Sequence, residues 1–500
     1  MITVAICQAG LEPWVGLGPD DGVICFEPDA AVFAAVFAAA KAAKPRPGSV
    51  YIASTLSGIR ATVARTWLVG QDYRVAGSVD DLATYGDDVQ RVIREGCNQQ
   101  MTSEHTLRLN VTEWTKIGLE VVTRLPGAPL VTTMPRCLEG VPAIVCGAGP
   151  SLDRAIRALR LAEGRAVIIA TNSAVGPLDR AGIHPDIVVA IEALSTSTGP
   201  VIGTEAWRRA IVVPGIHANI GVWDAPCRAV IPAPQITGPV GELLCRRLGL
   251  KSLDIGGSVL HLGTELAMLL GCSPLVLVGA DLAIGGGEYA VGVAHAKRRA
   301  VVGEAPVDEA LVVEVSAHGG GTVRSTRLFD QYRQWLQDSI EGRSDVINAS
   351  IGGACITGTT EIQPHQLQSK RWPRVDAQER ILAATAEAKR LAPEELIEAL
   401  SSGLEESRSY AETTASIAAG AAALEGRIAK IVMTSCGQTS ILAGAGSGPL
   451  DDDAQLPSII QLRAACRVFE RVGATWAWLE PAMAETIARL EAMGSKEVAA

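Results

Sequence analysis

The sequence predicts an α/β protein built around an open, mainly parallel sheet, with a smaller N-terminal α/β domain and a helical C-terminal domain. Up to about residue 365, short apolar runs alternate with helix-like segments, which is typical of parallel sheets with crossover helices. Beyond about residue 373, the apolar residues follow helical spacing. Aromatic residues are only 4% of the chain, while alanine and glycine are abundant, and this composition favours helix-covered sheets over β-sandwiches.

The length and composition set the broad class of the protein. A chain of 500 residues exceeds one ordinary core, and we place three domains at 1–130, 140–365 and 373–500. The net charge of −10 argues against nucleic-acid binding, which needs a basic surface. Eleven scattered cysteines without a C-x-x-C pair indicate reduced core thiols. Without a signal peptide or a membrane-spanning apolar run, we expect a cytoplasmic protein.

The first domain is expected to be a small parallel α/β unit. Its apolar runs predict strands at 2–7, 22–29 and 50–54, with an alanine-rich helix at 30–43 that the sequence KPRPGS ends. A further helix over 104–124 is expected to lead into the second domain.

The second domain repeats a strand–helix pattern that is typical of a Rossmann-like sheet. The elements expected here are strands at 142–146, 166–172, 185–193, 210–215, 274–284 and 345–350, helices at 152–162, 256–271 and 329–342, and a hairpin at 311–325. Ligands of such sheets bind at the carboxyl ends of strands, here after Cys146, Thr171 and Val278.

The third domain is expected to be helical, because 377–392 and 474–493 repeat apolar residues with helical spacing. An acidic linker is expected at 442–457. Packing against the second domain or oligomerisation is the role we expect for these helices.

The sequence GAGPS directly follows the strand at 142–146 and opens the next helix. Gly147, Ala148 and Gly149 would let the backbone approach an anion, while a helix starting near Ser151 would direct N–H groups at a phosphate. Pro150 fixes φ where a missing N–H costs little. A tight structural turn is the alternative interpretation. The lysine of a P-loop is missing, which argues against ordinary P-loop chemistry.

Other candidate site residues follow the next strand ends. Asn172, followed by Ser173, stands where a dinucleotide site would have a ribose-binding acid; an amide both donates and accepts, which suits the edge of a base or pterin. A helix N-cap is an equal alternative for Asn172. Gly279 and Asp281 end the strand at 274–284, and the carboxylate could bind a metal, orient a histidine or cap a turn.

Two histidines in glycine-rich segments are candidates for a general base. His295 lies in the segment 285–299, and His318 lies in SAHGGG. The seven histidines show no zinc-binding spacing, so we expect no structural zinc.

Five segments resemble, in order, the MptE-like domain of motility-associated factor (Maf) glycosyltransferases. They are PAIVCGAGPSLD, IIATNSAVGPLDRAGIHPDIVVAIEA, GGSVLHLGTELAMLLGCSPLVLVGADLAI, VAHA and VINASIGGACITGTTEI. The resemblance covers about 140–365, and GVICFEPDAAVFAAVFAA is similar to the N-terminal region of that family. The G-x-G-P-S loop followed by a strand ending in Asn is also similar to small bacterial sialyltransferases.

This resemblance implies a glycosyltransferase that moves a nonulosonic acid, of the sialic, pseudaminic or legionaminic type, from a CMP-activated donor to Ser or Thr hydroxyls of flagellin. It implies that the GAGPS loop holds the CMP phosphate, with Ser173 and Gly279 nearby, that Asn172 contacts cytosine or ribose, and that His295 is the base of an inverting transfer. Asp281 or Glu192 is the candidate for electrostatic assistance.

Two other functions stay open. The same domain resembles an archaeal enzyme that uses ATP and Mg²⁺ to pyrophosphorylate 6-hydroxymethyl-7,8-dihydropterin, and this diphosphokinase activity would depend on strand-end acids such as Asp281. A non-catalytic, flagellin-associated scaffold would tolerate the loss of His295. No cofactor other than Mg²⁺ is expected in any of these cases.

Overall fold

The structure, a computed structural model, describes most of the chain. The described residues are 2–6, 22–43, 50–66, 73–193, 195–235, 238–253, 256–284, 290–291, 293, 311–370, 372–406, 408 and 479–493.

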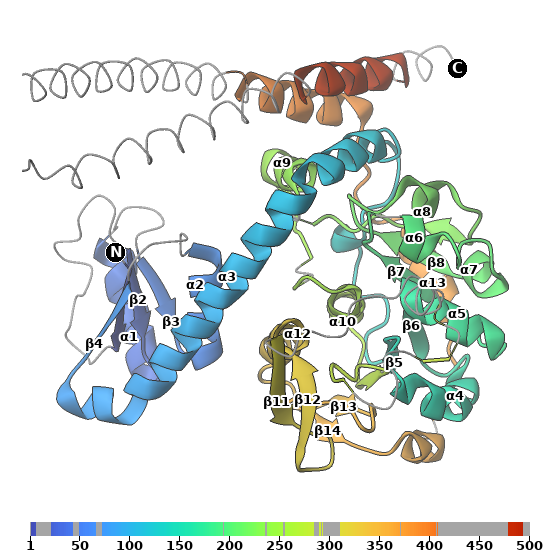
Figure 1. Ribbon diagram of the computed structural model, residues 1–500. Helices are drawn as coiled ribbons and strands as arrows, with labels where there is room; N and C mark the ends of the chain where they lie inside the picture. The colour runs from blue at the N-terminus through green and yellow to red at the C-terminus, as the bar shows by residue number, and fades with distance from the viewer. Residues whose placement is uncertain are drawn as a thin grey trace, which may run out of the picture.

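The N-terminal part is a parallel sheet covered on both faces (Figure 1). Its four described strands have the order β3-β2-β1-β4 and the bounds β1 Ile2–Ile6, β2 Gly22–Phe26, β3 Val50–Ala53 and β4 Tyr73–Ala76. Because side chains alternate along a strand, Ile24 and Phe26 pack toward α2 (Leu56–Thr66), while Val23 and Cys25 pack toward α1 (Ala30–Ala43). The predicted helix at 30–43 and three of the strands are therefore confirmed, and β4 and α2 are additional.

A single helix, α3 (Val79–Val122), connects this sheet to the rest of the molecule (Figure 1). We predicted a helix only over 104–124, and the observed helix begins about 25 residues earlier. Ser78 caps its start by accepting a hydrogen bond from the Asp81 N–H at 3.2 Å. The earlier turns are stabilised by buried residues with helical spacing, among them Val89 and Ile93, which pack in the core shared with α2.

The main sheet confirms the predicted fold class, because every strand pair in it is parallel. In the described part, eight strands have the order β14-β13-β10-β5-β6-β7-β8-β9. Their bounds are β5 Ala143–Cys146, β6 Val167–Thr171, β7 Ile187–Ala190, β8 Ile211–Pro214, β9 Ala229–Val230, β10 Leu275–Val278, β13 Val346–Asn348 and β14 Thr360–Glu361. The short edge strand β14 follows the strand that the sequence indicated as the last.

Helices cover both faces of this sheet, which gives two separate apolar cores. The first core includes side chains of α3, α4 (Ser151–Ala162), α5 (Asn172–Arg180), α7 (Glu205–Arg209), α8 (Ile220–Asp224) and α9 (Pro239–Leu248). The second includes side chains of α10 (Val259–Leu269), α12 (Arg327–Ser339) and α13 (Ala377–Ala384). Fully buried strands such as β5 contribute alternate residues to the two cores, which explains their unbroken apolar sequence.

The remaining described segments extend these two layers. The predicted hairpin is present as β11 (Val312–Ser316) paired with β12 (Thr322–Thr326). The segments 393–406 and 479–493 are helical and pack on the first core through Leu396, Leu400, Met483 and Leu490. The predicted linker at 442–457 lies outside the described residues. No helix in the described ranges is long and apolar enough to cross a membrane.

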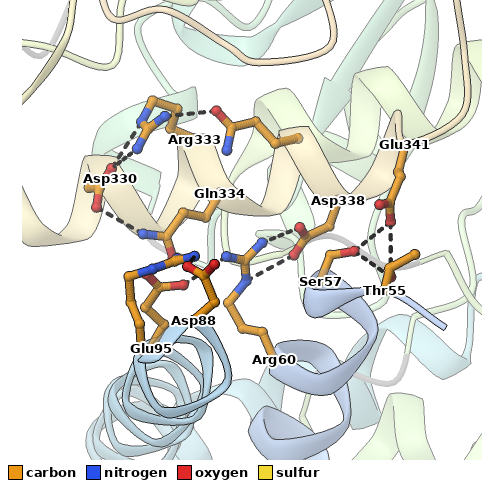
Figure 2. A network of polar contacts seen from close by, with 12 residues as sticks. Thr55, Ser57, Arg60, Asp88, Glu95, Asp330, Arg333, Gln334, Asp338 and Glu341 are labelled. Carbon is orange, nitrogen blue, oxygen red and sulfur yellow. Dashed lines mark hydrogen bonds and ion pairs between the residues drawn. The ribbon is translucent and has the colours of Figure 1, made fainter. Parts of the chain in front are cut away.

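A cluster of charged and hydroxyl side chains joins the N-terminal sheet region to α12 (Figure 2). We call it the Arg60 cluster; its members are Thr55, Ser57, Arg60, Glu95, Asp338 and Glu341. The Arg60 guanidinium donates from Nη1 to Glu95 at 2.8 Å and from Nε to Asp338 at 3.2 Å, and its second Nη atom bonds the other Asp338 oxygen. Ser57 Oγ donates to Glu341. This contact fixes α12 against α2 and α3.

Candidate functional site

The strand order reverses at β5, which makes this position a topological switch point of the sheet. From β5 the chain continues through β6 to β9 on one side, and then returns to β10 and β13 on the other side. Crevices of open α/β sheets lie at such points, beyond the carboxyl ends of the strands. The three strand ends that we predicted to carry the ligand site belong to β10, β5 and β6, which are neighbours in the sheet.

The loops that follow β5 and β10 pack directly on each other. Gly147 N–H donates to the Val278 carbonyl at 2.8 Å, and Gly149 N–H donates to the Gly279 carbonyl at 2.9 Å. A Cβ atom on Gly149 would lie 2.7 Å from the Gly279 oxygen and would also overlap the carboxylate of Asp281. The glycines therefore serve the close approach of two backbones, whatever further role they have with a ligand.

The carboxylate of Asp281 occupies the start of α4. It accepts hydrogen bonds from Ser151 N–H at 3.2 and 3.3 Å and from Ser151 Oγ at 2.7 Å. Pro150, at the N-cap of α4, has no side-chain group for this purpose. Burial raises the pKa of Asp281, and the bonds from Ser151 oppose that rise. The structure thus shows that the Asp281 carboxylate caps this helix. A phosphate that bound to Ser151 would either share these donors with the Asp281 carboxylate or displace it.

Two neighbouring segments, the loop after β13 and the strand β12, hold Asp281 in this position. The Ala354 N–H donates to its carbonyl at 2.7 Å, and the N–H of the preceding residue donates to Ser350 Oγ at 2.9 Å. Leu282 follows with a φ of 47°, which is unusual for a residue with a side chain, and its carbonyl accepts a bond from Ser325 Oγ at 2.7 Å. We did not predict either serine from the sequence, although Ser350 lies two residues after β13 in the motif VINASIGGAC.

Asn172 is the first residue of α5 and is fully buried. Neither its Oδ1 nor its Nδ2 has a hydrogen-bond partner. The N-cap position belongs to Thr171, and no side chain caps this helix, so the N-cap interpretation of Asn172 is wrong. An unpaired buried amide costs about 1–3 kcal/mol. The structure places this unpaired amide beside the switch point, where a ligand could satisfy it. Ser173 follows in the first turn of α5.

The two candidate bases differ in what the structure shows of them. His295 lies outside the described residues. His318 Nε2 lies 3.1 Å from the Asn348 carbonyl oxygen. Because a carbonyl oxygen only accepts hydrogen bonds, this nitrogen must bear the proton, and only Nδ1 of His318 is left to act as a base.

Glu192 follows β7 at the same edge of the sheet. Burial raises the pKa of its carboxyl group. The hydroxyl of Tyr332 on α12 has a pKa raised to about 12, first by burial and then by the charge of Glu192. Tyr332 could not be predicted as a site residue, because nothing in the sequence of α12 connects it with the strand edge.

Metal ligands and thiols are two further kinds of group that bear on the chemistry of the site. Within the described ranges, no group of three His, Cys, Asp or Glu side chains could hold a metal ion. Cys146 ends β5, and burial raises the pKa of its thiol to about 12, which makes it an unreactive core thiol.

An apolar cavity of about 290 Å³ lies elsewhere, between α3, α9 and the two C-terminal helical segments. None of the strand-edge residues described above lines it. We therefore do not assign it to the reaction site.

Comparison with known proteins supports the resemblance seen in the motifs. Residues 122–287 match the family described as 6-hydroxymethylpterin diphosphokinase MptE-like. The fold is similar to that of the Maf glycosyltransferase from Magnetospirillum magneticum AMB-1, with a TM-score of 0.52 and 17% identity over 98% of this chain and 78% of that one. No curated protein matches the sequence. The MptE-like resemblance is thus confirmed over residues 122–287, and at 17% identity the likeness to the Maf glycosyltransferase shows the fold alone.

Proposed function

We propose that this protein is a glycosyltransferase that moves a nonulosonic acid from a CMP-activated donor to Ser or Thr hydroxyls of a protein, with flagellin as the acceptor. The observation that carries the proposal is the unpaired, fully buried amide of Asn172 beside the switch point. Cytosine presents a donor and acceptors on one edge, so a side chain that both donates and accepts is complementary to it. The fold shared with a Maf glycosyltransferase supports the same class of reaction.

In this proposal the CMP phosphate lies near the start of α4. The helix dipole and the Ser151 donors would stabilise the charge that develops on the phosphate as CMP leaves. Asp281 already bonds these donors. Two anions at one helix terminus repel each other, so donor binding requires that Asp281 binds a proton, moves, or shares a cation such as Mg²⁺ with the phosphate.

Calorimetric titration with CMP tests the proposal. Replacing Asn172 with alanine removes both polar atoms, and we expect CMP affinity to fall about tenfold or more, in line with one or two lost hydrogen bonds. Asn110→Ala is the matched control, because that amide only bonds the Thr106 carbonyl within α3. Equal CMP affinities of the two variants would remove the base-reading role from Asn172.

The MptE-like match supports a second candidate, a diphosphokinase that acts on 6-hydroxymethyl-7,8-dihydropterin. A pterin also presents donors and acceptors on one edge, so it too would satisfy Asn172. Titration with ATP and Mg²⁺ distinguishes the two activities. Binding of ATP with Mg²⁺ but not of CMP would favour the kinase, and binding of neither would favour a non-catalytic scaffold.

A further inference from the structure

Glu192 lies beside Asn172 at the carboxyl edge of the sheet. Thr171 of β6 pairs with Val189 of β7, and Glu192 is the second residue beyond the end of β7. The backbone at this point is fixed, because Asn219 N–H donates to the Glu192 carbonyl at 2.9 Å and Asn219 Nδ2 donates to the Ala193 carbonyl at 3.2 Å. Neighbouring strands lie about 5 Å apart, so the two segments that carry Asn172 and Glu192 are neighbours at this edge of the sheet.

The carboxylate of Glu192 differs from the other carboxylates with burial-raised pKa values. Asp186 accepts a bond from Ile168 N–H at 2.8 Å, Asp281 caps α4, and Asp338 pairs with Arg60. No hydrogen bond or ion pair of the Glu192 side chain is found within the described ranges, although the residue is more than half buried. A partly buried carboxylate with a raised pKa and no bond to another described residue is a candidate to accept a proton from a ligand.

Tyr332 lies near enough to Glu192 for the charge of that carboxylate to raise the pKa of its phenol. Its ring packs edge-on against His261, with ring centroids 5.3 Å apart at 88°, and a Cβ atom on Gly257 would be in contact with it at 3.4 Å. Its raised pKa keeps the phenol protonated at neutral pH, so it can only donate to an anion and can donate to or accept from a hydroxyl. A phenol and a carboxylate that lie near each other can both bond to one hydroxyl group of a ligand.

We infer that Glu192 is the proton acceptor of the transfer and that Tyr332 positions the attacking hydroxyl. This inference rests on the proposed function. The acceptor oxygen forms a bond to the anomeric carbon while the bond from that carbon to the phosphate oxygen breaks. CMP leaves with the bonding electrons, and the hydroxyl proton passes to a carboxylate oxygen of Glu192. With water in place of the protein acceptor, the same step hydrolyses the donor.

The test uses the full chain and measures release of CMP to water from CMP-activated N-acetylneuraminic, pseudaminic and legionaminic acids, together with CMP affinity. Glu192→Gln should keep CMP affinity within about threefold while release falls about 10²- to 10⁴-fold, and the acidic limb of the pH profile should disappear. Tyr332→Phe should keep that limb and lower the rate about tenfold. Asp186→Asn is the matched control, because this second carboxyl with a raised pKa precedes β7 at the opposite edge.

Several results would overturn the inference. If Glu192→Gln releases CMP at nearly the wild-type rate and the acidic limb of its pH profile is intact, Glu192 is not the base. Loss of that limb in His295→Ala would then assign the role of base to the histidine. If Glu192→Gln loses CMP affinity in proportion to its rate, the side chain binds the donor instead. If the wild type neither binds CMP nor turns over any of the three donors, the proposed function fails and the inference fails with it.

Discussion

Replacing Arg60 with methionine should weaken the contact between the N-terminal sheet region and α12. The methionine keeps most of the aliphatic stem, so the change mainly removes the charge and its hydrogen bonds. Glu95 and Asp338 would then face each other without the cation that separates them (Figure 2). The loss is therefore larger than that of an ordinary ion pair, because it leaves two carboxylates close together in a partly buried interface.

The structure sets the size of this effect. The Arg60 side chain is 9% exposed, and those of Glu95 and Asp338 are 21% and 23% exposed. Breaking a buried pair costs about 3–5 kcal/mol, and partial hydration of the two acids places this case near 3 kcal/mol. Burial already raises the pKa of Asp338 to about 6, so this group can bind a proton when Arg60 is gone. The loss of stability should therefore be larger at pH 8 than at pH 5.5.

Arg91→Met is the matched control for this prediction. Arg91 also pairs with Glu95, at 3.0 Å, and with Asp88 at 2.8 Å, but its side chain is 48% exposed, so we expect a loss of about 0.5 kcal/mol. Urea unfolding of the full chain gives the free energies, and hydrogen exchange over 56–66 and 327–339 gives the local opening. If the two variants lie within 1 kcal/mol of each other at pH 8, or if exchange in α12 is unchanged in Arg60→Met, the reasoning is refuted.

Two further predictions concern the main sheet. Gly149→Ala should lower the free energy of unfolding by about 1–3 kcal/mol, because the added Cβ atom would overlap Asp281. Gly86→Ala in α3 should raise it by up to about 1 kcal/mol, because the atom nearest to the added Cβ would be 3.9 Å away. Equal melting temperatures of the two variants would contradict this prediction. Burial raises the pKa of Asp186 from 3.8 to about 6, so its charged form costs stability above pH 6 and nothing below pH 4. Asp186→Asn should therefore stabilise the protein by about 1–2 kcal/mol at pH 7.5 but not at pH 4, as measured by urea unfolding at both pH values.

The sequence was sufficient to predict the parallel sheet and the edge at which its candidate site lies. Unbroken apolar runs indicate strands buried on both faces, and the residues that follow them, such as Asn172 and Asp281, must lie at the carboxyl ends. The start of α3 was missed, because a polar surface hides the spacing of its few buried residues. The domain boundaries, and the roles of the predicted site residues with a ligand, stay predictions.

Contacts between segments far apart in the chain could not be predicted in this way. Ser151 and Asp281 belong to different strand–loop units, and only the order of strands brings β5 beside β10. The same holds for Tyr332, which approaches Glu192 because α12 packs over α10. Local patterns indicate which face of an element is buried, but they carry no information about which loop lies opposite.

The length of α3 has a mechanical consequence for the whole molecule. Its 44 residues form a rod about 66 Å long, with α2 beside its residues 89–97 and Val240 of α9 against Gly118 near its C-terminal end (Figure 1). A rod of this length acts as a lever: a tilt of ~10° about one end moves the other by roughly 11 Å. A small change in the packing of α3 against α9 would therefore displace the N-terminal sheet by a much larger distance. The Arg60 cluster opposes this displacement because it joins α2 to α12. The stability of the cluster therefore determines how far the N-terminal sheet can move when α3 tilts.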